Sequence, residues 1–204
     1  MSTTLLDQLA RVSFPTLGHF LEHGFADHGM RSLLVDMRMI GRVRTLQLAD
    51  ADAIAVNRAL ARIGPGDVLV IDMQGDHAHA PVGAVTATAA RQAGAAGIVI
   101  DGVATDVPEL RGIGLPVFAR GTSVLTTKRR GLDTSRHDVP VQCGGMRVEP
   151  GMIALGDDNG LLFAQASVLA DVIEKAQASD RAEPAILARL LANEPVASVL
   201  GMAL

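Results

Sequence analysis

Two short aliphatic runs separated by a helix-forming stretch constrain the fold of this chain most strongly. Residues 67–72 (DVLVID) and 97–101 (GIVID) are almost continuously aliphatic and lie between turn residues, which is typical of strands buried on both faces of a sheet. Between them, residues 83–92 are rich in alanine and other good helix formers, and Gly94 follows as a helix stop. A strand, a loop, a helix and a second strand in this order predict a β-α-β unit, and therefore an α/β fold.

The remaining helices and strands are predicted from the spacing of apolar residues and from turn residues. Helices are predicted at 16–22, at 51–63 with Asp50 or Asp52 as the N-cap, at 105–111, from 168 onward with Ser167 as the N-cap, and at 181–204. Strands are predicted at 41–48 and 115–119, followed by a meander of short strands at 139–143, 146–148, 153–155 and 161–164. Because no linker is long enough to split the chain, we expect a single domain over 1–204, with its core at 16–164 and C-terminal helices at 166–204.

Composition excludes several classes of protein. The 204 residues are 49% hydrophobic and 20% charged, a balance that allows a buried core and excludes an intrinsically disordered chain. The formal net charge is -4 and aromatic residues make up only 2%, so a basic surface and the rings on which single-stranded nucleic acids stack are both scarce. The longest uncharged run, 77–90, is shorter than the roughly 20 apolar residues of a membrane helix. We therefore expect neither a nucleic acid nor a membrane as a partner.

Cysteine usage and the first residues of the chain bear on its location. Cys143 is the only cysteine, so no intrachain disulfide can form, which fits a reducing compartment. Asp7 and Arg11 occur before an apolar stretch of signal-peptide length develops. We therefore expect a cytoplasmic protein. Cys143 itself is expected to be a buried small apolar residue rather than a nucleophile.

A glycine at the start of the predicted helix 83–92 marks the first candidate site. The N–H groups of Ala84, Val85 and Thr86 lie in the first helical turn, where they lack intrahelical carbonyl partners, so they could hold a carboxylate or a phosphate group. The alternative is that Gly83 only allows close packing of the turn. The spacing of the residues alone favours neither interpretation.

Acidic residues follow the predicted buried strands. Asp72, Asp76, Asp101 and Asp106 lie at or after the C-terminal ends of adjacent strands, which is where α/β folds usually bind their ligands. Oxygen ligands in this position would suit Mg²⁺ or Mn²⁺. The sequence therefore predicts a divalent metal at this edge of the sheet.

Histidines and one basic run are the remaining polar groups with chemical potential. His77 and His79 alternate in the loop after the first buried strand, and His19 and His23 are one helical turn apart. Because neither pair has the third and fourth ligands of a closed zinc site, we interpret them as solvated imidazoles. The run 128–130 (KRR) could bind an anion, although a short basic cluster is more often a solvated surface.

Four segments, GDVLVID, VGAVTATAARQAGAAGIVIDGVATD, LPVFARG and DVPVQCGGMRVEPGMIALGDDNGLLF, occur in this order over about residues 16–164. Together they resemble the RraA-like family, which includes the 4-hydroxy-4-methyl-2-oxoglutarate aldolases and the regulators of RNase E activity. The resemblance implies a swivelling β/β/α domain that assembles as a homotrimer or a hexamer, with sites at subunit interfaces. In the aldolases of this family a divalent metal polarises a 2-oxo acid and a carbon–carbon bond breaks, and oxaloacetate decarboxylation is an accompanying activity.

Carried over position by position, the resemblance assigns roles to the first candidate site. Asp106 takes the place of the metal-binding aspartate, and Thr105 and Asp106 stand at the catalytic positions. The substrate-binding positions fall on Thr105 and on the loop whose backbone amides hold the pyruvate carboxylate, namely Gly83, Ala84, Val85 and Thr86.

The sequence departs from the family pattern at two polar positions. Where the family has arginine before the metal-binding aspartate, this chain has Thr105, which supplies neither a fixed charge nor a bidentate donor. Where an acidic residue often follows the loop glycine in the aldolases, this chain has Ala84. The sequence leaves open whether the missing guanidinium is replaced by a neighbouring subunit or by one of three arginines of this chain, Arg91, Arg111 and Arg120.

Two functional hypotheses follow. The first is a lyase that depends on Mg²⁺ or Mn²⁺ and acts on a small 2-oxo acid, such as a 4-hydroxy-2-oxo dicarboxylate or oxaloacetate. The second is a non-catalytic RraA-like regulatory or binding protein that acts through protein–protein contacts, because one fold serves many functions. Asp106 favours the lyase, whereas Thr105 and Ala84 favour the regulator. Of the two, we expect the lyase.

Overall fold

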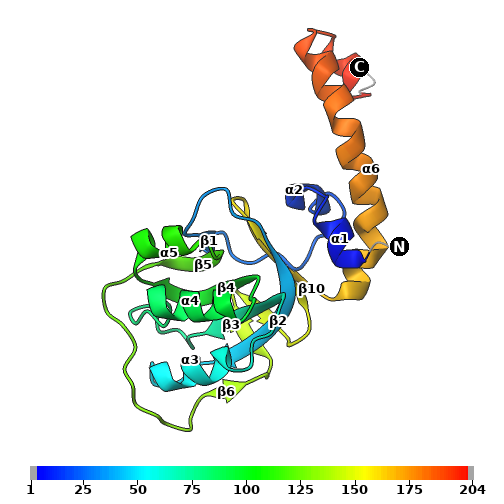
Figure 1. The fold of residues 1–204 in the computed structure, drawn as a ribbon. Coiled ribbons are helices and arrows are strands. Elements are labelled where there is room, and N and C mark those ends of the chain that lie inside the picture. Colours follow the sequence, from blue (N-terminus) through cyan, green and yellow to red (C-terminus); the bar gives the residue numbers. More distant parts are fainter. Residues whose placement is uncertain (1–3, 202–204) are drawn as a thin grey trace. The chain divides into compact units, whose positions relative to one another are not determined.

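The computed structural model describes residues 4–201. The chain divides into two compact units (Figure 1). The smaller unit contains the N-terminal residues up to Glu22 and the chain from Ser167 onward, and the larger unit contains residues 23–166. The prediction that residues 1–204 form one domain stays a prediction. No helix among residues 4–201 is both long enough and apolar enough to cross a membrane.

The larger unit is built on one mixed sheet of eight strands. The spatial order is β1-β5-β4-β3-β2-β9-β10, with β6 paired to β2. Strands β2 to β5 are parallel to one another, whereas β1, β6, β9 and β10 are antiparallel to their neighbours. The bounds are β1 Arg31–Ser32, β2 Met39–Gln47, β3 Asp67–Asp72, β4 Gly97–Ala104, β5 Val117–Thr122, β6 Arg136–His137, β9 Ile153–Asp157 and β10 Gly160–Ala164. The parallel pairing of β3 with β4 around a helix confirms the predicted β-α-β unit.

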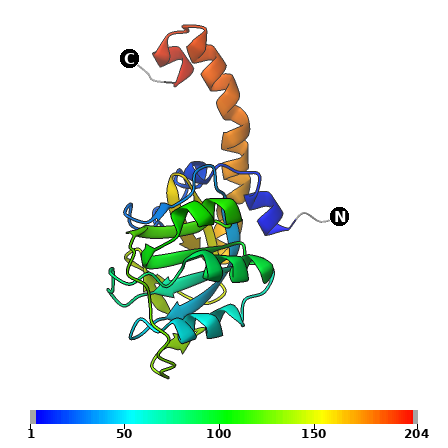
Figure 2. The ribbon, with the colours of Figure 1, turned by 60° about the vertical axis from the view of Figure 1, so that its left-hand side comes forward.

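Three helices cover one face of the sheet, and Figure 2 shows them side by side. They are α3 Ala53–Leu60, α4 Ala84–Gln92 and α5 Val107–Ile113. A two-stranded hairpin, β7 Val141–Cys143 and β8 Met146–Val148, packs on the other face. Because side chains alternate along a strand, Leu69 and Ile71 of β3 join the core under the helices, while Val68 and Val70 join the core under the hairpin. The three layers confirm the expected β/β/α arrangement.

The start of α3 also holds a distant segment of the chain. Asp52, one of the two predicted N-caps, accepts a hydrogen bond from Ile54 N–H at 2.9 Å. Its fully buried carboxylate also accepts from the N–H groups of Arg130, at 3.0 Å, and Leu132, at 2.7 Å. The segment 128–132 is therefore fastened beside the C-terminal end of β2.

The smaller unit consists of helices. They are α1 Leu5–Leu9, α2 Phe14–Leu17, α6 Ala166–Leu191 and α7 Val196–Val199. Asp180 of α6 accepts hydrogen bonds from Ser13 N–H, at 2.6 Å, and from the Thr16 hydroxyl. This carboxylate therefore joins the start of α2 to the middle of α6.

Three sequence predictions for this unit are wrong in detail. The helix predicted at 16–22 is α2, which ends before Gly18. Ser167 is not an N-cap, because α6 already begins at Ala166. The helix predicted from 181 onward is the second half of α6, which continues through Pro184 to Leu191, followed by the short α7. Residues 202–204 of that prediction lie outside the described part of the chain.

Candidate functional site

The candidate site forms where the chain leaves β4 and where α4 begins. Asp106 is the residue before α5, and Gly83 is the residue before α4. The Asp106 Oδ2 atom accepts a hydrogen bond from Ala84 N–H at 2.9 Å, and Thr105 N–H donates to the Val82 carbonyl at 2.9 Å. These two bonds join the loops, so the structure brings Gly83, Ala84, Thr105 and Asp106 together.

Gly83 is required at this position because of close approach. Its φ of -142° is extended backbone open to any residue, but a Cβ atom there would lie 2.4 Å from Asp106 Oδ2 and 2.8 Å from Thr105 Cγ2. The two interpretations of Gly83 left open by the sequence are therefore both partly correct. The glycine allows close packing, and the start of α4 does hold a carboxylate, which belongs to Asp106 of the same chain.

The backbone of Asp106 directs its carboxylate toward α4. A residue in this position usually caps its own helix, yet Asp106 makes no side-chain hydrogen bond to α5. Its φ of 58° and ψ of 41° lie in the left-handed region, which is costly for a residue with a Cβ atom and is found most often at functional sites. The conformation aims the carboxylate at the positive end of the α4 dipole.

Two backbone amides beside Asp106 have no partner within the described chain. The N–H groups of Val85 and Thr86 lie in the first turn of α4, where helix geometry provides no acceptor. The Val85 side chain is 85% exposed, and the Thr86 hydroxyl lies 3.4 Å from the Pro81 carbonyl. These amides could therefore donate to a ligand carboxylate that approaches from solvent.

The charges in this site fit a divalent cation. A ligand carboxylate at Val85 and Thr86 would lie beside the Asp106 carboxylate, and two such anions repel each other unless a cation lies between them. Asp106 Oδ1 and the hydroxyl oxygen of Thr105 lie 3.3 Å apart, and both are oxygen atoms of the kind that bind Mg²⁺. Mg²⁺ is commonly bound by one or two carboxylates, with water and substrate oxygens as its other ligands.

The other predicted acidic ligands are not part of this site. Asp72 is buried and accepts from the N–H groups of Gln74 and Gln142. Asp101 pairs with Arg120 and accepts from Gly144 N–H. Over residues 4–201, no three His, Cys, Asp or Glu side chains are grouped so that they could hold a metal. Asp72 and Asp101 therefore bond loops of the fold, and Asp106 stays the predicted metal ligand.

Two of the three arginines considered as replacements are already engaged. Arg91 donates to the Ile113 carbonyl. Arg120 donates to Asp101 and also lies 3.9 Å from Asp27, and the bond to Asp101 raises the pKa of the Arg120 guanidinium, although burial opposes this. Neither guanidinium is free to replace the one that Thr105 lacks.

Cys143 is buried, as the sequence predicts. Burial, together with the nearby carboxylates of Asp101 and Asp72, raises the pKa of its thiol far above the usual value. The thiol is therefore protonated at neutral pH and is not a nucleophile.

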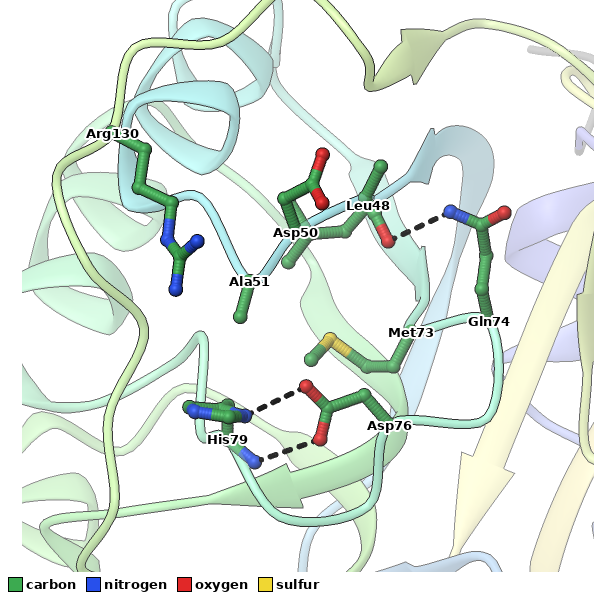
Figure 3. A pocket seen from close by; sticks show the side chains of 9 residues that line it. Leu48, Asp50, Ala51, Met73, Gln74, Asp76, His79 and Arg130 are labelled. Carbon is green, nitrogen blue, oxygen red and sulfur yellow. Dashed lines mark hydrogen bonds and ion pairs between the residues drawn. The ribbon is translucent and has the colours of Figure 1, made fainter.

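A second polar region lies at the C-terminal ends of β2 and β3 (Figure 3). Its pocket of about 520 Å³ shares no residue with the site around Asp106. Asp76 and His79 pair on one wall, and Arg130 of the basic run lies on another. The sequence analysis named these groups separately, Asp76 as a possible metal ligand, the run 128–130 as a possible anion site and His79 as a solvated imidazole, but did not bring them together. His79 differs from His77 through the geometry of the loop, which brings the His79 ring to the Asp76 carboxylate.

With this geometry established, comparisons with known proteins decide the family. A model of the RraA-like family, described as aldolase/RraA, matches residues 2–163. The chain belongs to the RraA-like family. A 4-hydroxy-4-methyl-2-oxoglutarate aldolase from Thermus thermophilus is 34% identical over 126 residues, which cover 62% of this chain and 75% of that protein.

Solved structures agree with the fold. The RNA-processing inhibitor RraA from Thermus thermophilus is 30% identical, with a TM-score of 0.68 over 76% of this chain and 93% of that chain. An uncharacterized protein from Pseudomonas syringae is 22% identical and has a TM-score of 0.83 over 98% of both chains, which shows the fold alone. Because the relatives include both an aldolase and an inhibitor, their names do not decide between the two functional hypotheses.

Proposed function

We propose that this RraA-like chain is a divalent-metal-dependent lyase that cleaves a small 2-oxo acid, such as a 4-hydroxy-2-oxo dicarboxylate or oxaloacetate. The observation that carries the proposal is the Asp106 carboxylate, which is hydrogen-bonded to the first turn of α4 and lies beside two amide N–H groups that can donate to an anion. The similarity to a named 4-hydroxy-4-methyl-2-oxoglutarate aldolase supports the same class of reaction. Our expectations of a homotrimer or hexamer and of a cytoplasmic location belong to this proposal.

Each residue of the site has a separate task in this proposal. Asp106 would hold Mg²⁺ or Mn²⁺, and the bond from Ala84 N–H to its Oδ2 fixes the orientation of the carboxylate. The Val85 and Thr86 amides hold the substrate carboxylate, and Gly83 keeps the α4 start close enough to Asp106 for both contacts. The metal would supply Lewis-acid polarisation of the 2-oxo group.

Thr105 limits the catalytic power of this arrangement. Its hydroxyl lies 3.3 Å from Asp106 Oδ1, so it can steady the carboxylate and donate one hydrogen bond. It carries no charge, and a neutral donor stabilises a developing negative charge less than a guanidinium does. We therefore infer a slower enzyme than a family member with arginine at this position.

The second candidate function is a non-catalytic regulator that acts through protein contacts. Two neutral residues favour it, Thr105 and Ala84, which stand where the family aldolases have charged groups. The similarity to a protein described as an RNA-processing inhibitor points the same way. On this alternative, the Asp106 bond to Ala84 would be purely structural.

Pyruvate release from oxaloacetate separates the two candidates. Rates are measured with and without Mn²⁺ for the wild type, Asp106→Asn and Asp171→Asn, after subtraction of the decarboxylation by Mn²⁺ alone. Asp171 is an exposed residue of α6, so its variant makes the same chemical change away from the site. The proposal expects Mn²⁺-dependent turnover that is lost only in Asp106→Asn. Rates at the Mn²⁺ background in all three proteins would contradict it and favour the regulator.

A further inference from the structure

The pocket at the C-terminal ends of β2 and β3 is a second place where polar groups converge. Its volume of about 520 Å³ lies within the range of small-molecule sites, which is about 300 to 1,000 Å³. It opens at the carboxyl ends of parallel strands, where α/β folds bind ligands. Its lining residues are Leu48, Ala49, Asp50, Ala51, Met73, Gln74, Asp76, His79 and Arg130.

The backbone around this pocket is held in an unusual conformation. Seven residues other than glycine have a positive φ in the described chain, and three of them, Asp50, Ala51 and Gln74, line this one pocket. Such conformations cost free energy and persist where the surrounding structure enforces them, most often at functional sites. Gln74 is fixed further by its side-chain bond to the Leu48 carbonyl, at 3.1 Å.

Asp76 orients the imidazole of His79. The Asp76 carboxylate accepts from Ala78 N–H at 2.9 Å and from His79 N–H at 3.1 Å, and its Oδ2 lies 2.8 Å from His79 Nδ1 (Figure 3). Burial alone would raise the pKa of Asp76, but these hydrogen bonds hold it below its usual value. Because an ionised carboxylate can only accept, Nδ1 carries the proton. With Nδ1 bonded to Asp76, Nε2 is the ring nitrogen of His79 that is left for a ligand.

Arg130 supplies a cation on the opposite wall. Its backbone is fixed by the bond from Arg130 N–H to the buried Asp52, and its guanidinium points toward His79 in Figure 3. No carboxylate of residues 4–201 forms an ion pair with it. A guanidinium without an internal partner, on a fixed backbone, is suited to bind a carboxylate by two parallel hydrogen bonds.

We propose that this pocket binds a small hydroxycarboxylate. Arg130 donates to the ligand carboxylate, and the ligand hydroxyl donates to Nε2 of His79, which Asp76 holds in place. The site is separate from the one proposed for the lyase reaction and does not depend on it.

The probes are L-malate and succinate, which carry the same two carboxylates and differ in one hydroxyl, together with inorganic phosphate. Binding is measured by isothermal titration calorimetry on full-length Asp106→Asn protein in EDTA, so that the proposed lyase site and its metal cannot contribute. We expect L-malate to bind, and succinate to bind about tenfold more weakly, because succinate lacks the hydroxyl that forms a hydrogen bond with His79. Phosphate binding as strong as that of L-malate would overturn the hydroxycarboxylate assignment.

Three variants in the same background locate the ligand. Arg130→Ala is expected to weaken both dicarboxylates by at least about tenfold, because it removes a charged hydrogen-bond donor. The control Arg129→Ala removes an equal charge from the adjacent exposed residue, which lines no part of the pocket, and is expected to change neither. In His79→Phe, L-malate and succinate are expected to bind equally.

Equal losses in Arg129→Ala and Arg130→Ala would overturn the proposal, since binding would then follow net charge. Absence of L-malate binding to the folded Asp106→Asn protein would also overturn it. The lyase proposal is tested by Mn²⁺-dependent turnover and not by these titrations, so the two proposals can fail separately.

Discussion

Gly83 and Asp106 depend on each other at the scale of single residues. The Oδ2 atom of Asp106 lies only 2.4 Å from the position that a Cβ atom of residue 83 would take. The left-handed backbone of Asp106 holds the carboxylate there. The sequence identified both residues but not their contact. Spacing does not reveal that Asp106 reaches across to α4 instead of capping α5, because this depends on the φ and ψ of a single residue.

Gly83→Ala is expected to lower the free energy of unfolding by about 1 to 3 kcal/mol, because the added methyl group overpacks the contact with Asp106. Gly112→Ala is the matched control. That glycine lies in α5 with no heavy atom within 4 Å of its would-be Cβ, so its substitution is expected to stabilise the helix by about 0.5 to 1 kcal/mol. Urea unfolding measures both. Equal stability of the two variants would show that Asp106 does not lie against Gly83.

Thr105→Arg is expected to raise kcat/KM for Mn²⁺-dependent cleavage of oxaloacetate by about tenfold or more, because a guanidinium adds a charged, bidentate donor beside Asp106. Thr105→Lys supplies a point charge without the planar fork and is expected to gain less. Initial rates of pyruvate release measure both. If the Thr105→Arg protein still binds Mn²⁺ but its rate of pyruvate release is unchanged, Thr105 does not face the substrate.

At the scale of elements, aspartates tie loops to helix starts and strand ends. Asp52 caps α3 and fastens the segment that carries Arg130, and Asp101 holds Arg120 of β5. The helical and aliphatic patterns predicted most elements of the larger unit, because those patterns follow from burial. The same patterns wrongly placed an N-cap at Ser167 and did not predict that α6 continues through Pro184. Local sequence signals are weak at these two positions, so packing determines where the helix begins and ends.

Asp52→Asn is expected to lower the free energy of unfolding at pH 7 by about 1 to 3 kcal/mol, because hydrogen bonds to a charged acceptor are weakened. Burial alone would raise the pKa of Asp52, but the N–H groups of Gly131, Ile54, Arg130 and Leu132 hold it below its usual value. A carboxylate with a depressed folded-state pKa stabilises the fold above its unfolded-state value, near 4, and loses that contribution as the pH falls through the folded-state pKa.

The stability difference between the wild type and Asp52→Asn should therefore narrow on acidification below about pH 4. Urea unfolding at several pH values measures this difference. Asp133→Asn, which changes the exposed aspartate just after the segment 128–132, is the control and is expected to change little at any pH. A difference that stays constant down to the acid-unfolding limit would contradict the account of Asp52.

At the scale of the molecule, the sheet topology gathers the chemically active groups at one edge. Asp52 follows β2, Asp76 and His79 follow β3, and Asp106 follows β4, and these three strands are parallel. The sequence predicted this edge because parallel strands place their carboxyl ends together. The sequence did not predict which carboxylates are free to bind a ligand. Asp72 and Asp101 accept hydrogen bonds from the N–H groups of Gln142 and Gly144, which lie far away in the sequence.

We propose Asp106 as the residue of this chain that holds a divalent cation. The most direct measurement is Mn²⁺ binding, followed by the electron paramagnetic resonance signal of free Mn²⁺, for the wild type, Asp106→Asn and Asp171→Asn. We expect about one Mn²⁺ to bind per chain in the wild type and in Asp171→Asn, and the affinity for Mn²⁺ to fall at least about tenfold in Asp106→Asn. Equal Mn²⁺ binding by folded wild-type and Asp106→Asn protein, or no binding by either, would contradict it.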